Sequence, residues 1–205
     1  MEARLWRLMA EEAMTLHAST LGMVHSHGIW SVAAGAICGY VISDSRMVEA
    51  SLKGLRNDGV SGGFYAQLDL LFSPDGYYIE GPYYQRFALR PLLLLAEAID
   101  RREPGRNIWQ YRDNLIRKSC YALFQLAFPD DTLPALNDGS KSMNLCDEGA
   151  LMAVSLCWQH YGPDARLAAL MQRQGRVWPS AGAIAMEQLD AVDARVRFDE
   201  GSAER

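Results

Sequence analysis

The chain has 205 residues, of which 49% are hydrophobic and 22% are charged, and its formal net charge is −5. This length and composition suit a folded domain with one sizeable hydrophobic core and exclude an intrinsically disordered chain. The negative charge argues against a nucleic-acid partner, because phosphate binding depends on clustered lysines and arginines.

Helical periodicity begins at the N-terminus. Apolar residues recur at helical spacing over 2–18, which predicts a first helix. The segment "GIWSVAAGAICGYVI" (28–42) predicts a second, whose small residues suit close contact with another helix. "SDSRMVEASLKGL" (43–55) predicts a third, capped by a serine or an aspartate. "NDGVSGG" (57–63) then breaks the chain before "FYAQLDLLF".

The second half is also rich in helical patterns. "SPDGYYIEGP" (73–82) predicts a turn and extended backbone, after which Pro82 can occupy the first turn of a long helix over 83–101 that Pro91 would bend. Further helical patterns cover 108–128, 145–162 and 164–174. We therefore predict an all-α fold of about seven helices in antiparallel hairpins, forming an (α/α) toroid or part of one, as a single domain over 1–205.

Several classes of protein are excluded by missing motifs. The four cysteines are widely spread without a CxxC pair, which argues against a zinc site or a disulfide scaffold, and we expect them to be buried apolar residues. There is no GxGxxG after a strand, no GxxxxGK[ST], no HExxH and no GxSxG. The N-terminal segment carries carboxylates in an amphipathic pattern, unlike a signal peptide, and "LRPLLLLAEAI" is too short to cross a bilayer. We expect no membrane insertion, and a cytoplasmic location is compatible with this.

Two histidines flank a serine in "MVHSHGIW", at the entrance of a predicted helix. His25 and His27 could bind a metal, but no third and fourth ligands follow at a recognisable spacing. A histidine just before Gly28 can equally cap the helix by hydrogen bonding. The spacing alone leaves a catalytic role and a capping role open.

The segment "EGPYYQRFALRP" places polar side chains in the first turns of the long predicted helix. Side chains and free N–H groups there can face a ligand carboxylate. Tyr83 and Tyr84 cannot share one helical face, so one can pack while the other faces a cleft. Arg86 and Arg90 lie on one side, four residues apart. The alternatives are tyrosines that fill the core and arginines that are solvated or pair with Glu80.

At this point a family resemblance becomes visible. "DGYYIEGPYYQRFALRPLLLLAEAI" (75–99), with the earlier "HSHGIW" and the later "LPALNDGSKS", resembles the helical domain of alginate and oligoalginate lyases in the heparinase II/III-like superfamily, over roughly residues 20–150. The resemblance implies a polysaccharide lyase that cleaves uronate-containing glycans by β-elimination. It implies an acidic oligosaccharide or polysaccharide as substrate, no metal or organic cofactor, and a periplasmic or secreted location. Family members typically join a toroid to a β-sandwich; no β-rich segment follows residue 175, so we expect an incomplete helical domain.

The resemblance also assigns residues. In that family an Asn-His pair and a later tyrosine form the catalytic core, which implies that His27 and Tyr83 are catalytic. Ser26 stands where the family has asparagine, and serine is shorter and donates only one hydrogen bond. We expect the substrate to be bound by Ser26, His25, Tyr84, Arg86 and Asn137.

These residues fit the chemistry of β-elimination. Ser26, His25 and Arg86 could neutralise the uronate carboxylate and so stabilise the charge that develops when the α-proton leaves. Tyr83 would donate a proton to the departing glycosidic oxygen and, where both groups lie on one face of the sugar, could first act as the base. His27 would lower the pKa of the phenol or be the base for the opposite stereochemistry.

Other readings stay open. Asn137, Asp138 and Lys141 could touch substrate, but Asn-Asp-Gly is also ordinary turn chemistry. Trp109 and Trp158 are expected in the core rather than as platforms for a sugar ring. The chain could be a truncated or decayed helical domain that binds saccharide without turnover, which the serine at position 26 and the missing segments favour. A heparin-type glycosaminoglycan lyase is disfavoured by the negative charge and modest arginine content.

Overall fold

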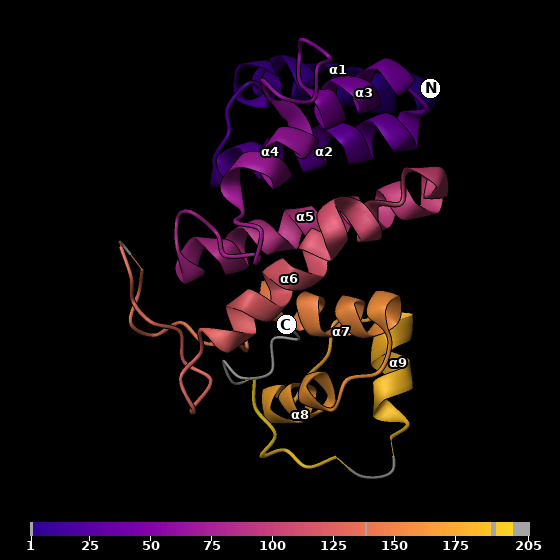
Figure 1. The fold of residues 1–205 in the computed structure, drawn as a ribbon. Helices are drawn as coiled ribbons and strands as arrows, with labels where there is room; N and C mark the ends of the chain where they lie inside the picture. Colours follow the sequence, from indigo (N-terminus) through magenta and orange to yellow (C-terminus); the bar gives the residue numbers. More distant parts are fainter. Residues whose placement is uncertain (1, 138, 190–191, 199–205) are drawn as a thin grey trace. The chain divides into compact units, whose positions relative to one another are not determined.

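The computed structural model describes residues 2–137, 139–189 and 192–198, and their regular structure is helical. Its helices are α1 (Glu2–Leu21), α2 (Ser26–Ile42), α3 (Ser45–Lys53), α4 (Gly63–Leu71), α5 (Pro82–Arg102), α6 (Tyr111–Gln125), α7 (Glu148–Tyr161), α8 (Ala165–Gln174) and α9 (Ala181–Glu187), with short 3-10 helices η1 (Pro104–Arg106) and η2 (Ile108–Gln110) (Figure 1). An isolated bridge joins Thr132 to Asn144, and no strand forms among the described residues. The predicted all-α fold is confirmed, and closure into a toroid stays a prediction.

The helices group into two compact units. The first unit comprises residues 1–73 and 94–108, and the second comprises residues 74–93 and 109–205. The helix α5 therefore contributes its first half to the second unit and its last half to the first unit. The assignment of the whole chain to a single domain stays a prediction.

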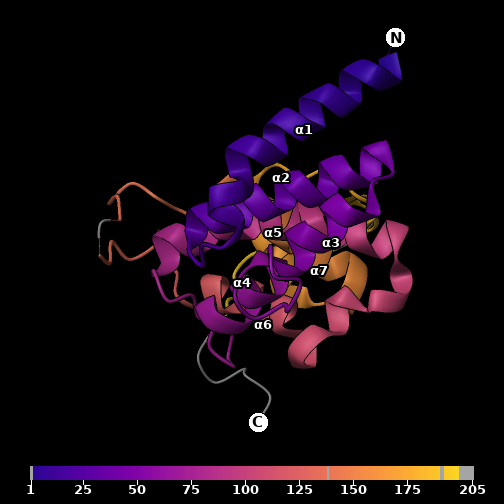
Figure 2. The same cartoon turned by 90° about the horizontal axis from the view of Figure 1, so that it is seen from above.

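In the first unit, α2 packs against α1, α3 and α4 (Figure 2). Its small residues allow a close approach, as predicted: a Cβ added to Gly39 would lie only 2.8 Å from Cγ2 of Val48 in α3. The turn between these helices uses Ser43 in the left-handed region, with φ of 58°. The carboxylate of Asp44 then accepts the N–H groups of Arg46 and Met47 at 3.0 and 3.2 Å and so caps α3.

In the second unit, α7 is the central helix and packs against α6, α8 and α9. Gly182 of α9 lies so close to α7 that an added Cβ would collide with the carbonyl oxygen of Ser155. Trp109 and Trp158 are 2% and 8% exposed, which confirms that they serve the core. The Trp109 ring stacks on His160 with 3.8 Å between ring centroids.

A left-handed turn opens α6. Arg112, Asp113 and Asn114 have φ of 46°, 55° and 58°, a region that residues other than glycine seldom adopt. Asp113 and Asn114 are of the types that adopt this region most often after glycine, but three such residues in succession have no recognised sequence pattern. Our prediction of one helix over 108–128 was therefore too long at its start, since the regular turns begin only after Asn114.

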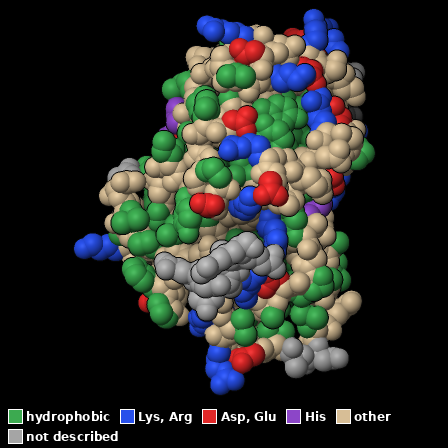
Figure 3. Space-filling model, viewed as in Figure 1, with side chains coloured by type: hydrophobic (Ala, Val, Ile, Leu, Met, Phe, Trp, Pro, Cys, Tyr) green, Lys and Arg blue, Asp and Glu red, His purple; other side chains and the backbone are tan. Residues whose placement is uncertain are grey.

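The cysteines and the surface complete the description. Cys120 and Cys157 are buried as predicted, whereas Cys38 and Cys146 are half-buried, and all four are free thiols. Acidic and basic side chains are interspersed with hydrophobic ones on the face drawn in Figure 3. Within the described part of the chain, no helix has both the length and the hydropathy needed to cross a bilayer.

Asp164 before α8 should make part of the stability depend on pH. Its carboxylate accepts the hydroxyl of Tyr121 at 2.7 Å and pairs with Arg166 at 2.7 Å. Burial works to raise the pKa of Asp164, but the bonds from Arg166 and Tyr121 outweigh burial and hold the pKa below its ordinary value. A lowered carboxyl pKa stabilises the fold above the unfolded-state value of about 4, and that stabilisation is lost as the pH falls through the folded-state pKa.

We therefore expect Asp164→Asn to lower the free energy of unfolding by about 1–3 kcal/mol near neutral pH. Asparagine keeps the helix cap, so the loss reports on the ion pair with Arg166 and the hydrogen bond from Tyr121. The difference from wild type, measured by urea unfolding, should shrink as the pH is lowered below about 4. A difference of the same size at pH 3 and pH 7 would contradict this account, and exposed Asp75→Asn serves as the control.

Candidate active site

The first group of candidate residues lies in the turn that begins α2. His25 is the N-cap, with φ of −167° and ψ of 176°, and its Nδ1 accepts the backbone N–H of His27 at 3.1 Å. The two imidazole rings meet edge to face, 5.3 Å between centroids, with His25 half-buried and His27 exposed. The helix is therefore capped by His25, whereas the capping role left open from the sequence was that of His27, the histidine directly before Gly28. Because Nδ1 of His25 is an acceptor, the proton of its neutral ring is on Nε2.

A buried glutamine that sequence reasoning missed supports this turn. Gln67 of α4 is 0% exposed, and its Nε2 donates to the carbonyl oxygen of Met23 at 2.5 Å. A Cβ added to Gly28 would collide with that carbonyl and lie 2.7 Å from the glutamine Nε2. Gly28 is therefore required by close packing, and Ser26 beside it is only 1% exposed. The one sequence signal was a glutamine within the apolar run "FYAQLDLLF".

The second group of candidate residues lies at the start of α5, in the second unit. Tyr83 and Tyr84 are both half-buried, and their rings meet edge to face at 5.1 Å. The guanidinium carbon of Arg86 lies 4.6 Å from the Tyr83 ring centroid, within range of a cation–π contact. Nη1 of Arg86 also pairs at 2.8 Å with Oδ2 of Asp147, the residue that caps α7. A phenol and a cation are thus held together.

Both arginines have carboxylate partners in the loop and helix that follow α6. Arg86 pairs with Asp147 as described, and Arg90 pairs with Glu148 at 2.9 Å. The carboxylate of Glu80 accepts the hydroxyl of buried Tyr78 at 2.9 Å. The partners Asp147 and Glu148 lie about sixty residues further along the chain, where no local pattern indicates them.

The loop residue Asn137 supports the turn before α5. Its Nδ2 donates to the carbonyl oxygen of Glu80 at 3.0 Å, and its backbone is left-handed with φ of 57°. Asn137 therefore has the role in a turn that the sequence offered as the alternative to substrate binding. Asp138 lies outside the described residues, and Lys141 is exposed.

Gln85, between the tyrosines and the arginine, is structural. It is 0% exposed, and its Nε2 donates to the carbonyl oxygens of Gly76 and Ser119 at 3.0 and 2.7 Å. Its Oε1 accepts the N–H of Tyr78 at 3.3 Å. One side chain therefore joins the turn before α5 to α6 and fixes where Tyr83 begins its helix.

The predicted residues consequently form two groups. His25, Ser26 and His27 lie together in the first unit, while Tyr83, Tyr84, Arg86 and Asn137 lie in the second. The pairing of the imidazole of His27 with the hydroxyl of Tyr83 stays a prediction. Across the residues that the structure describes, no three His, Cys, Asp or Glu side chains gather where a metal ion could be held.

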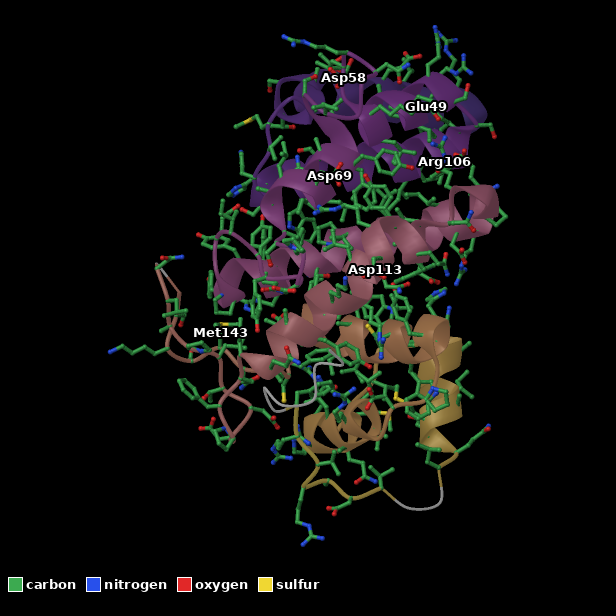
Figure 4. The ribbon with its side chains drawn as sticks, in the orientation of Figure 1. Glu49, Asp58, Asp69, Arg106, Asp113 and Met143 are labelled. Atoms are coloured by element: carbon green, nitrogen blue, oxygen red, sulfur yellow. The ribbon has the colours of Figure 1, made fainter. Side chains whose placement is uncertain are left out.

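A cavity in the first unit holds another cluster of ionisable groups. Its volume is about 310 Å³, and it is lined by α2, α3 and the end of α5. The hydroxyl of Tyr40 donates to Glu103 at 2.7 Å, and burial together with Glu103 raises the Tyr40 pKa above its ordinary value. Arg106 pairs with Glu103 at 2.6 Å and with Glu49, its neighbour in Figure 4. A hydrogen bond from Lys53 lowers the pKa of Glu49. These groups satisfy one another, as in a structural network.

The fold and these contacts define the class of the protein. It is an all-helical protein whose candidate residues form a histidine turn and a Tyr–Arg–Asp cluster. No family model matches the chain. The chain is 42% identical over 158 residues to an exo-oligoalginate lyase of Saccharophagus degradans, which covers 77% of this chain and 21% of that protein. It is 37% identical over 198 residues to an alginate lyase of Stenotrophomonas maltophilia, which covers 97% of this chain and 26% of that protein. The chain thus spans about a quarter or less of the length of these curated relatives.

Proposed function

We propose that the chain carries catalytic helices of a polysaccharide lyase that cleaves alginate by β-elimination. The similarity to two lyases named for alginate or oligoalginate supports the substrate class. The observation that carries the reaction type is the guanidinium of Arg86, 4.6 Å from the Tyr83 ring. Membership of the heparinase II/III-like superfamily, a toroidal arrangement of the helices and a periplasmic or secreted location belong to the same proposal.

The proposed chemistry divides between the two groups of residues. A base removes the proton α to the uronate carboxylate, the C–O bond to the leaving sugar breaks, and a carbon–carbon double bond forms. Tyr83 gives a proton to the leaving oxygen, and the cation beside its ring stabilises the phenolate that results. His27 has an exposed ring that a ligand can reach, so it can accept the α-proton.

A direct assay tests this function. Incubation of the chain with alginate should raise the ultraviolet absorbance, because the new double bond is conjugated with the carboxylate. Heparin run in parallel should give no rise, since the two curated relatives are named for alginate or oligoalginate. Growth of absorbance with heparin and not with alginate would replace the substrate in the proposal.

A second candidate is a saccharide-binding helical domain without turnover. The burial of Ser26 favours it, because a side chain that is 1% exposed offers little to a substrate carboxylate. Calorimetric titration with oligoalginate separates the two functions. Heat of binding without any rise in absorbance, at high protein concentration, would establish the binding domain and reject the lyase.

A further inference from the structure

Asp147 uses its two carboxylate oxygens for two different tasks. Oδ1 accepts the N–H of Gly149 at 2.9 Å and so caps α7. Oδ2 accepts Nη1 of Arg86 at 2.8 Å. The side chain is 24% exposed and that of Arg86 is 11% exposed, so the pair is shielded from much of the solvent that weakens surface ion pairs.

The guanidinium of Arg86 depends on this carboxylate for its place. The Nε atom of this guanidinium is buried without a hydrogen-bond partner. The backbone of Arg86 also packs closely on the start of α7, because a Cβ added to Gly149 would collide with the carbonyl oxygen of Arg86. Its other contact is the face of the Tyr83 ring, which attracts a cation but does not fix its orientation. An arginine side chain released from such a partner gains several rotamers. Asp147 is thus the contact that fixes the guanidinium beside the phenol.

We propose that Asp147 is a positioning residue of the active site: it holds Arg86 against Tyr83, so that the phenol meets a cation in a fixed place. The proposal rests on the lyase function proposed above. Asp147 touches neither substrate nor reacting atoms in this scheme and acts through Arg86.

Asp147→Asn separates the two tasks. The asparagine oxygen can still accept the N–H of Gly149, and asparagine is a good N-cap. Its second atom is an NH₂ donor where Arg86 needs an acceptor, so the ion pair is lost. The matched control is Glu148→Gln, which removes the neighbouring and more exposed pair with Arg90, 42% and 41% exposed, without touching Tyr83.

In the alginate assay, Asp147→Asn should lower kcat by about tenfold to a hundredfold, the range for a charge-assisted hydrogen bond, with KM changed by less than about threefold. Glu148→Gln should leave both close to wild type. In an Arg86→Lys background, Asp147→Asn should cause little further loss of kcat, because both substitutions remove the same contact between the two side chains. Full additivity, or a kcat equal to wild type, would overturn the positioning role.

A spectroscopic measurement tests the same contact without turnover. In NMR spectra of the full chain, the ring current of Tyr83 should displace the side-chain signals of Arg86, with Tyr83→Leu as the reference. Asp147→Asn should abolish that displacement while Glu148→Gln preserves it. A displacement that survives in Asp147→Asn rejects the proposal even if the enzyme is active. If the signals of wild type and variants differ as predicted but the wild-type protein cleaves no alginate, the geometry is supported and the lyase function is rejected instead.

Discussion

Tyr83→Phe is expected to lower the rate of alginate elimination by about a hundredfold to ten-thousandfold, the usual contribution of a positioned acid or base. The substitution removes only the hydroxyl that would protonate the leaving oxygen. Phenylalanine keeps the ring that faces Arg86 and Tyr84, so the packing at the start of α5 should persist. The measurement is the initial rise in absorbance, with thermal unfolding to confirm that the fold is intact.

A neighbouring tyrosine supplies the control for this substitution. Tyr77 is 41% exposed and lies in the turn before α5, so Tyr77→Phe should leave the rate near that of wild type. Full activity in Tyr83→Phe would remove this residue from the mechanism. If Tyr84→Phe instead lost all elimination, the adjacent phenol would take over the assigned role.

Gln85→Leu is expected to lower the free energy of unfolding by about 3 kcal/mol or more. Leucine fills a similar volume but leaves the carbonyls of Gly76 and Ser119 and the N–H of Tyr78 without the bonds that Gln85 supplies. Each buried group left without a partner costs about 1–3 kcal/mol. Urea unfolding measures the loss as a shift of the midpoint.

The control for this change is another glutamine. Gln110 is exposed and makes no side-chain capping bond at the start of α6, so Gln110→Leu should change stability by less than about 0.5 kcal/mol. An equal effect of both substitutions would show that the buried hydrogen bonds of Gln85 contribute nothing specific. The Gln85→Leu protein that still folds should also have a lower rate of alginate elimination, since the turn that precedes Tyr83 loses its support.

Most helices could be predicted because their signals are local. Apolar periodicity and capping residues located α1 to α3 and α5 to α8 within a few residues, and Pro82 does begin α5. The helix α9 was missed because its seven residues are too few to show a period. The left-handed turn at 112–114 was missed because Asp113 and Asn114 are only a weak signal for it, and they lie within a segment whose apolar periodicity is helical.

The candidate site was predictable only in part. The sequence indicated a histidine cap at the start of α2 but attributed it to the histidine directly before Gly28, whereas His25 is the N-cap. The partner of Arg86 could not be predicted, because Asp147 lies 61 residues away and only the folded second unit brings the two side chains together. Gln67 was missed for the same reason, since the carbonyl that it supports is 44 residues distant.

Because one carboxylate both caps α7 and holds Arg86, any movement that takes the Asp147 side chain away from the helix end also takes the acceptor away from the guanidinium. The amide proton of Gly149 can exchange with solvent only when Oδ1 of Asp147 releases it. Deuterium uptake at this amide therefore reports how often the Asp147 side chain leaves its place. A slow backbone exchange rate would then indicate that the acceptor of Arg86, a side chain 63 positions earlier in the chain, stays in position.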